Sequence, residues 1–193
     1  MTVERIELPS PAPGTRRHLL VHRFGREGAR PKAYLQAGLH ADELPGVAIL
    51  VHLLERLEAL DATGAVRGEV VVVPVANPVG LAQSVMGQTL GRYDLAQMSN
   101  FNRGWPELGE AVAERVGGRL GGDADANGEL VRETMVELAR ELPADSENAA
   151  LRKELFCTAV GADTSDVARL VTPTRHGDRG SATRVVAPAG EHP

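Results

Sequence analysis

The chain has 193 residues and a formal net charge of −5, which is unlike the basic balance of most nucleic-acid-binding domains. Its single cysteine excludes an internal disulfide, and no apolar run approaches the roughly 20 residues of a membrane span. The N-terminus also lacks the apolar segment of a signal peptide. The sequence therefore predicts one cytoplasmic domain that binds neither nucleic acid nor membrane, and leaves a homo-oligomer open.

The first half of the chain reads as two strands, a helix and a third strand. A Pro-rich start, through Gly14, is predicted to be irregular. Strands are predicted over 16–24 and 32–39. Apolar residues at helical spacing predict a helix over 43–61, with Pro45 where a helix start tolerates proline.

The most clearly patterned strand covers 68–78, GEVVVVPVANP. A continuous valine run is typical of a strand buried on both faces, as in a parallel sheet covered by helices. A strand, a helix and a strand in this order indicate an α/β fold. We predict a mainly parallel sheet flanked by helices, with 32–39 and 68–78 as neighbours.

The second half begins with a segment that shows little periodicity, residues 79–107. A loop of this length in a compact domain is usually functional or disordered. Three helices are predicted after it, over 108–120, 128–143 and 147–163. The composition then loses its aromatic and leucine residues, so 164–193 is predicted to be an irregular tail.

His40 and Glu43 lie three residues apart where the predicted second strand meets the helix. Catalytic zinc takes imidazole nitrogen and carboxylate oxygen, with three protein ligands and one open position. The ends of strands in open α/β sheets are also where such folds bind ligands. The alternative is a loop histidine beside a glutamate that is favourable at a helix N-terminus.

Asn102 and Arg103 stand in the motif NFNRGWP, within the long segment after the valine strand. An arginine there suits bidentate hydrogen bonding to a carboxylate, and Arg92 in GRYDL could be a second anion contact. The alternative is an arginine paired with a surface acid.

Other residues carry weaker signals. Residues 121–130, GGDADANGEL, resemble the start of a calcium loop, but the twelfth position is Thr134 rather than the required glutamate. An acidic turn between helices is the alternative. Cys157 has no basic or histidine neighbour in sequence and is predicted to be a buried thiol rather than a nucleophile.

Three histidines other than His40 fall within the predicted elements. His18 and His22 are predicted to share one face of their strand, because their separation is even. His52 lies on a mixed face of the predicted helix. All three favour packing or surface roles over ligation.

Taken together, AGLHADELPG, the strand ending in VANPVGL, and NFNRGWP resemble the succinylglutamate desuccinylase/aspartoacylase family in order and spacing. The resemblance covers roughly residues 16–163. It implies a zinc carboxypeptidase-like α/β fold and a zinc-dependent amidohydrolase that deacylates N-acyl amino acids.

The resemblance also implies roles for individual residues. His40 and Glu43 stand where the family has its first two zinc ligands. Asn102 and Arg103 stand in the pair that holds the substrate carboxylate, and Arg92 is matched to an upstream substrate arginine. Within the family, zinc polarises the acyl carbonyl and activates water, and a separate glutamate moves the proton.

The sequence departs from the family after about Asp163. The family continues into a strand that ends in Asp-Leu-His, which supplies the third zinc ligand, and the catalytic glutamate follows later. We interpret 1–163 as the N-terminal part of a zinc-hydrolase catalytic domain and 164–193 as a truncated or frameshifted tail. No catalytic residue is assigned, and the chain is expected to be inactive alone. The alternatives are a non-catalytic carboxylate-binding α/β module and an unrelated domain.

Overall fold

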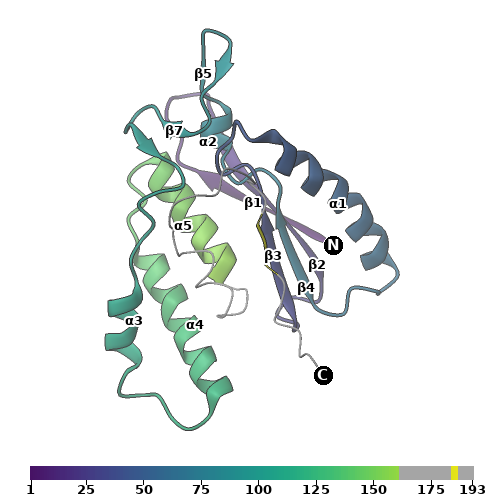
Figure 1. Cartoon of the computed structure of the whole chain (residues 1–193), viewed down its shortest axis with the longest axis vertical. Helices are drawn as coiled ribbons and strands as arrows, with labels where there is room; N and C mark the ends of the chain where they lie inside the picture. Colours follow the sequence, from purple (N-terminus) through teal and green to yellow (C-terminus); the bar gives the residue numbers. More distant parts are fainter. Residues whose placement is uncertain (161–183, 187–193) are drawn as a thin grey trace, which may run out of the picture.

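The computed structural model describes residues 1–160 and 184–186, and its centre is a five-stranded sheet with helices on both faces (Figure 1). The strand order is β1-β2-β4-β3-β9. These strands cover Thr2–Leu8 (β1), Arg17–Gly25 (β2), Lys32–Gln36 (β3), Glu69–Val73 (β4) and Arg184–Val186 (β9). The helices around the sheet are Leu44–Ala62 (α1), Gly109–Val116 (α3), Ala124–Glu141 (α4) and Glu147–Val160 (α5).

The predicted strand–helix–strand unit is confirmed. β3 and β4 are parallel neighbours in register from Lys32↔Glu69 to Gln36↔Val73, and α1 connects them. β4 lies between β2 and β3 rather than at an edge. Its three consecutive valines, Val71, Val72 and Val73, are fully buried, as a strand covered on both faces requires.

The prediction of a mainly parallel sheet is wrong for the described residues. β1 and β2 are antiparallel, as are β2 and β4, and β3 and β9. A buried valine run requires cover on both faces, but it does not fix the direction of the neighbouring strands. The architecture is therefore α/β with a mixed sheet.

Two hydrophobic layers cover the two faces of the sheet. On one face, Val72 and Phe24 pack with Leu50 of α1. On the other, Val71 and Val73 pack in a cluster with Leu151 and Leu155 of α5. Figure 1 shows α1 and α5 on opposite sides of the strands. Both helices are thus anchored to a common sheet.

The N-terminal residues were predicted to be irregular, and this is wrong for β1. It pairs with β2 along its whole length, from Thr2↔Arg23 to Leu8↔Arg17. Most of its side chains are exposed, and only Leu8 is fully buried. An edge strand held mainly by backbone pairing carries little of the apolar pattern from which a strand is predicted.

Residues 79–107 are more ordered than a single irregular loop. A short helix, Pro78–Leu81 (α2), begins with Asn77 as its cap. Two small hairpins follow, formed by Ser84–Val85 (β5) with Gln88–Thr89 (β6) and by Tyr93–Asp94 (β7) with Ser99–Asn100 (β8). Two-residue strands are too short to give a period in the sequence.

The acidic turn before α4 is a helix cap in this structure. The Asp123 carboxylate accepts hydrogen bonds from the amides of Asp125 and Ala126, so the helix begins at Ala124. The prediction placed this helix start at 128. An acidic turn between helices, the alternative to a calcium loop, accounts for these contacts, because the oxygen of a cap aspartate accepts hydrogen bonds from helix amides.

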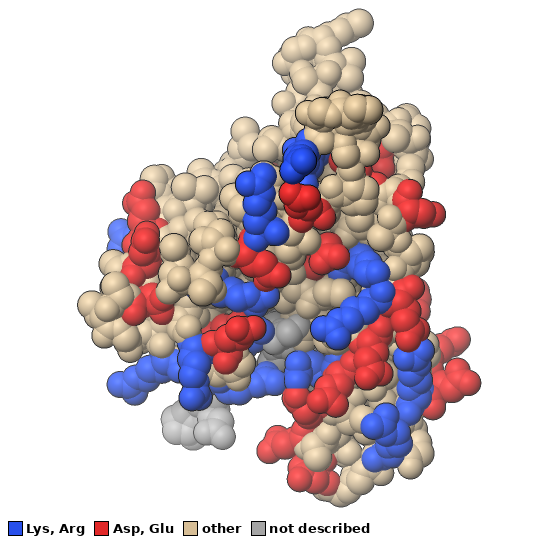
Figure 2. All heavy atoms as spheres, turned by 180° about the vertical axis from the view of Figure 1, so that it is seen from behind, with Lys and Arg blue, Asp and Glu red and all other residues tan. Residues whose placement is uncertain are grey.

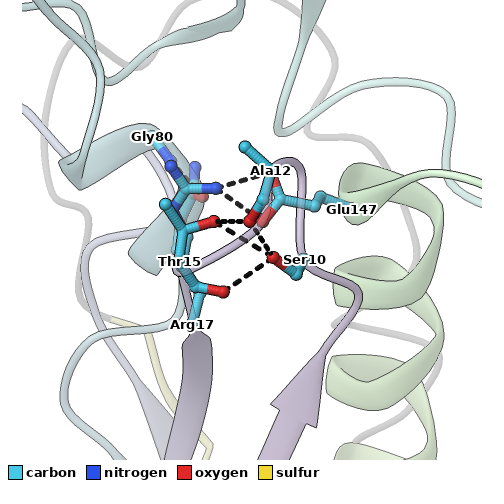
Figure 3. A network of polar contacts seen from close by, with 7 residues as sticks. Ser10, Ala12, Thr15, Arg17, Gly80 and Glu147 are labelled. Atoms are coloured by element: carbon cyan, nitrogen blue, oxygen red, sulfur yellow. Dashed lines mark hydrogen bonds and ion pairs between the residues drawn. The ribbon is translucent and has the colours of Figure 1, made fainter.

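The turn between β1 and β2 is tied to α5 by a polar network (Figure 3). Arg17 Nη1 donates to both carboxylate oxygens of Glu147, at 2.6 and 2.7 Å. The Ser10 hydroxyl donates to the carbonyls of Ala12 and Thr15, which shapes the turn. The start of α5 is therefore held against the beginning of β2 by a charge-assisted contact.

The remaining expectations concern the end of the chain and the membrane. Most of the predicted irregular tail, 164–193, lies outside the described residues, and within it only 184–186 is described, as strand β9. In the part of the chain that the structure describes, no helix is long and apolar enough to cross a membrane.

Candidate functional site

His40 lies in the connection between β3 and α1, at the carboxyl end of a central strand. The backbone there continues to pair with its neighbours, because the Ala37 amide donates to Val73 O and the Ala76 amide donates to Ala37 O. The buried Asn77 side chain donates to Leu39 O, directly before the histidine. His40 is held in this position and is itself only 8% exposed.

Both ring nitrogens of His40 face oxygen atoms. Nδ1 lies 3.3 Å from Glu43 Oε1, and Nε2 lies 2.9 Å from Asn100 Oδ1. The same Asn100 oxygen accepts a hydrogen bond from the Asn102 amide at 2.8 Å. That contact fixes the orientation of the Asn100 side-chain amide, so Nε2 of His40 is the protonated nitrogen.

Nδ1 of His40 therefore either carries no proton and turns its lone pair toward the Glu43 carboxylate, or carries the second proton of an imidazolium. A neutral imidazole with Nε2–H donated to a side-chain carbonyl is the arrangement found for metal-bound histidines. An imidazolium would instead make an ion pair with Glu43.

The spacing of His40 and Glu43 fits a shared metal ion. Two ligand atoms about 2.1 Å from a tetrahedral zinc ion are about 3.4 Å apart. The observed separation between His40 Nδ1 and Glu43 Oε1 is 3.3 Å. The nitrogen and oxygen types are also those that zinc takes. The donor pair predicted from the sequence therefore comes together with suitable chemistry.

Arg92 is the third side chain of this cluster. Its Nη2 donates to Glu43 Oε1 at 2.5 Å, the same oxygen that faces His40. Arg92 directly precedes β7, and the Gly91 carbonyl beside it accepts the Ala41 amide at 2.9 Å. The contact between Arg92 and Glu43 neutralises the Glu43 carboxylate without a metal, while the Arg92 side chain remains 43% exposed.

Asn102 and Arg103 lie on the adjoining turn after β8, with exposed side chains. Arg103 Nη1 donates to the carbonyl of Asn102, and Trp105 Nε1 donates to Asn102 Oδ1. No carboxylate among the described residues makes an ion pair with Arg103. The alternative of an arginine paired with a surface acid is not what the structure shows, so its guanidinium is available to an external anion.

One residue that was not predicted, Asn100, links the cluster of His40, Glu43 and Arg92 to the Asn102–Arg103 turn. Asn100 contacts His40 through its side chain and the Asn102–Arg103 turn through its side chain and backbone. It stands in the same NFNR motif. The only signal for it was its place two residues before Asn102, where an Asx turn is common.

A third metal ligand is not found within the described residues. No group of three His, Cys, Asp or Glu side chains suited to one ion occurs in 1–160 or 184–186. Residues 161–183, where the family pattern would place the next ligand, lie outside the described part.

The remaining candidates have other environments. Burial lowers the pKa of His22, which disfavours its charged form. Burial, with Glu154 nearby, raises the pKa of the Cys157 thiol, so it is a poor nucleophile at neutral pH. The Nδ1 atom of His18 is buried and has no hydrogen-bond partner in the described structure. His52 is exposed on α1. None of them joins the His40 cluster.

The comparison with protein families matches the segment that contains this cluster. Residues 29–116 match the model described as the succinylglutamate desuccinylase/aspartoacylase catalytic domain. These residues are similar to that family's catalytic domain. They include β3, α1, β4 and both hairpins, and hence His40, Glu43, Arg92 and the Asn102–Arg103 pair.

Two solved structures extend the similarity. A crystal structure of a protein assigned to the same family from Shewanella amazonensis is 28% identical, with a TM-score of 0.69 over 83% of this chain. A second such protein, from Shewanella frigidimarina, is 23% identical with a TM-score of 0.73, and supports the fold alone. The chain spans 44% of each of these proteins. No curated protein matches.

Proposed function

We propose that this chain contributes part of a zinc-dependent amidohydrolase site that acts on N-acyl amino acids. The observation that supports it most is the facing pair of His40 Nδ1 and Glu43 Oε1 at 3.3 Å, backed by Asn100 on the other ring nitrogen. His40 and Glu43 would hold the ion. When bound, zinc polarises an acyl carbonyl and lowers the pKa of its water.

The other residues of the site would bind and orient the substrate. Asn102 and Arg103 lie on one exposed turn, next to the Asn100 that contacts His40. A guanidinium can donate two parallel hydrogen bonds to a carboxylate, which fixes the direction of the amino acid. Arg92 donates to Glu43 in the free protein and, being half-exposed, can also reach an incoming anion.

The substrate role of Arg103 has a direct test. We expect Arg103→Ala to weaken binding of an N-acetyl amino acid by about 10- to 150-fold, because a hydrogen bond to a charged group contributes about 1.5–3 kcal/mol. Arg119→Ala, at an exposed turn residue after α3, is the matched control and should leave the affinity unchanged. Equal affinities of Arg103→Ala and the unaltered protein, measured by calorimetry, would exclude the role.

For residues 1–193 alone we predict weak or substoichiometric zinc and no deacylation above background. Catalytic zinc takes three protein ligands, and a positioned general base contributes about 10²–10⁴ in rate. The test is zinc content by mass spectrometry together with release of acetate or succinate from N-acyl amino acids. Stoichiometric tight zinc with zinc-dependent turnover would contradict the prediction.

A carboxylate-binding module without metal is the second candidate. The Arg92–Glu43 contact favours it, because the Glu43 charge is already neutralised. This candidate predicts binding of an N-acyl amino acid that does not change on adding zinc or a chelator. The zinc-site proposal predicts that binding is stronger when zinc is present.

A further inference from the structure

Arg152 of α5 lies beneath the turn that carries Asn102 and Arg103. Its Nη1 donates to Gly104 O at 2.8 Å, and its Nη2 donates to Asn100 O at 3.1 Å. One guanidinium therefore holds both ends of the five-residue segment 100–104. The fit is close at Gly104, since a methyl group added there would lie 3.3 Å from Arg152 Nη1.

The surroundings of Arg152 distinguish it from a surface ion pair. The guanidinium makes no ion pair with a carboxylate among the described residues, and its Nε is buried without a hydrogen-bond partner there. Burial lowers the pKa of Arg152, and the charge of Asp94 opposes that effect. Partial burial of a cation that is hydrogen-bonded only to backbone carbonyls costs free energy.

The contacts of Arg152 lead directly to the site. The Asn100 carbonyl that it holds also accepts the Arg103 amide, and the Asn100 side chain contacts both His40 and the Asn102 amide. Between the two held carbonyls, Phe101 is buried in the same cluster as Leu151 and Leu155 of α5. The segment is thus fixed to α5 by one buried ring and one guanidinium.

We infer that Arg152 is a positioning residue that sets the 100–104 turn and, through Asn100, the orientation of the His40 ring. Its action on the turn is independent of ligand. Its effect on zinc and carboxylate binding rests on the function proposed above. Helix α5 therefore supports the 100–104 turn and, through Asn100, His40, in addition to covering the sheet.

Lys153 supplies a matched control on the same helix. Its Nζ also holds two backbone carbonyls, those of Arg140 and Leu142, but they lie at the end of α4, away from the site. Lys153→Gln removes an anchor of α5 with similar chemistry. A general loosening of the helix would therefore show in Lys153→Gln as well as in Arg152→Gln.

The test is amide hydrogen exchange of the metal-free chain followed by zinc titration. We expect Arg152→Gln to speed exchange of the Asn102 and Arg103 amides at least tenfold, with β4 amides unchanged, and to weaken zinc binding by about tenfold. Lys153→Gln should change neither. Unchanged exchange at 102 and 103 in Arg152→Gln, or equal effects of both variants, would overturn the inference.

Two further outcomes remain decisive. If Arg152→Gln does not fold, Arg152→Lys replaces it, since a single nitrogen on a shorter stem then stands in place of the two nitrogens, Nη1 and Nη2, that hold Gly104 O and Asn100 O. The same two amides should lose protection. If the unaltered chain binds no zinc, the proposed function fails, while the exchange of the Asn102 and Arg103 amides still decides the role of Arg152.

Discussion

Glu69, at the start of β4, is the most enclosed charged side chain of the described structure. Its carboxylate accepts the Gly28 amide at 2.9 Å, Lys32 Nζ at 3.1 Å and Arg23 Nη1 at 3.2 Å. Burial alone would raise its pKa, but these donors outweigh burial and hold the pKa of Glu69 below its usual value of 4.5. The folded state therefore favours the charged form.

Removing that charge should leave Lys32 and Arg23 without their buried partner. We predict that Glu69→Gln lowers the free energy of unfolding by about 3 kcal/mol at neutral pH. Glu4→Gln, which removes the half-exposed second partner of Arg23, should cost under about 1 kcal/mol. Urea unfolding measures both, and equal costs would contradict the assignment.

The same contacts predict a pH dependence. Because the folded pKa of Glu69 lies below the unfolded value, its stabilisation is present above about pH 4.5 and is lost as the pH falls through the folded pKa. The stability difference between Glu69→Gln and the unaltered chain should accordingly shrink in acid. A difference that stays constant from neutral pH down to acid would contradict this.

The residue types of the site followed from the sequence, but the contacts between them did not. His40, Glu43 and Arg103 were predicted from motif spacing and from a family resemblance. Asn100 and Arg152 were not, because an asparagine in a turn and an arginine in a helix are ordinary residues there. Their roles depend on α5 packing under the 100–104 turn, which joins segments about 50 residues apart in sequence.

At the scale of elements, the approach of the β7 hairpin to the His40 loop depends on Gly91. A methyl group at Gly91 would lie 2.6 Å from the Ala41 carbonyl carbon, closer than real Cβ atoms come to backbone. The hydrogen bond from the Ala41 amide to Gly91 O joins the same two segments. The loop that holds His40 and the hairpin that holds Arg92 can meet only with glycine at this position.

We predict that Gly91→Ala costs about 1–3 kcal/mol and separates these segments, since overpacking forces the backbone to move. Gly109→Ala, at the open start of α3, should be neutral or stabilising by up to about 1 kcal/mol. Unfolding curves measure the cost, and exchange of the Ala41 amide reports the separation. A stable Gly91→Ala with a protected Ala41 amide would contradict this.

Elements with a long apolar period were predictable, and short ones were not. The helix predicted over 43–61 is α1, Leu44–Ala62, and the valine run is β4. The edge strand β1 was not predicted because its side chains are largely exposed. The two hairpins were not predicted because their strands have only two residues each. The directions in which strands pair depend on tertiary contacts, and the spacing of apolar residues along the sequence carries no information about them.

At the scale of the whole molecule, the site lies at one end of the sheet beside an uncharged projection. Figure 2 shows the molecule from behind. Acidic and basic side chains are interleaved over the middle and lower parts of this face, while the uppermost part carries neither. Figure 1 identifies this projection as the β5–β6 hairpin, where Met86 is 99% exposed. On this face, basic side chains are therefore interleaved with acidic ones rather than gathered into one basic surface.

The central claim is that His40 and Glu43 bind one zinc ion, and nitrogen NMR of the His40 ring during zinc titration tests it most directly. The account predicts that the Nδ1 signal shifts on adding zinc, that Nε2 keeps the proton donated to Asn100, and that Glu43→Gln weakens the effect. The exposed His52 serves as the internal control. An unchanged His40 signal, or the same zinc uptake in His40→Ala, would contradict the claim.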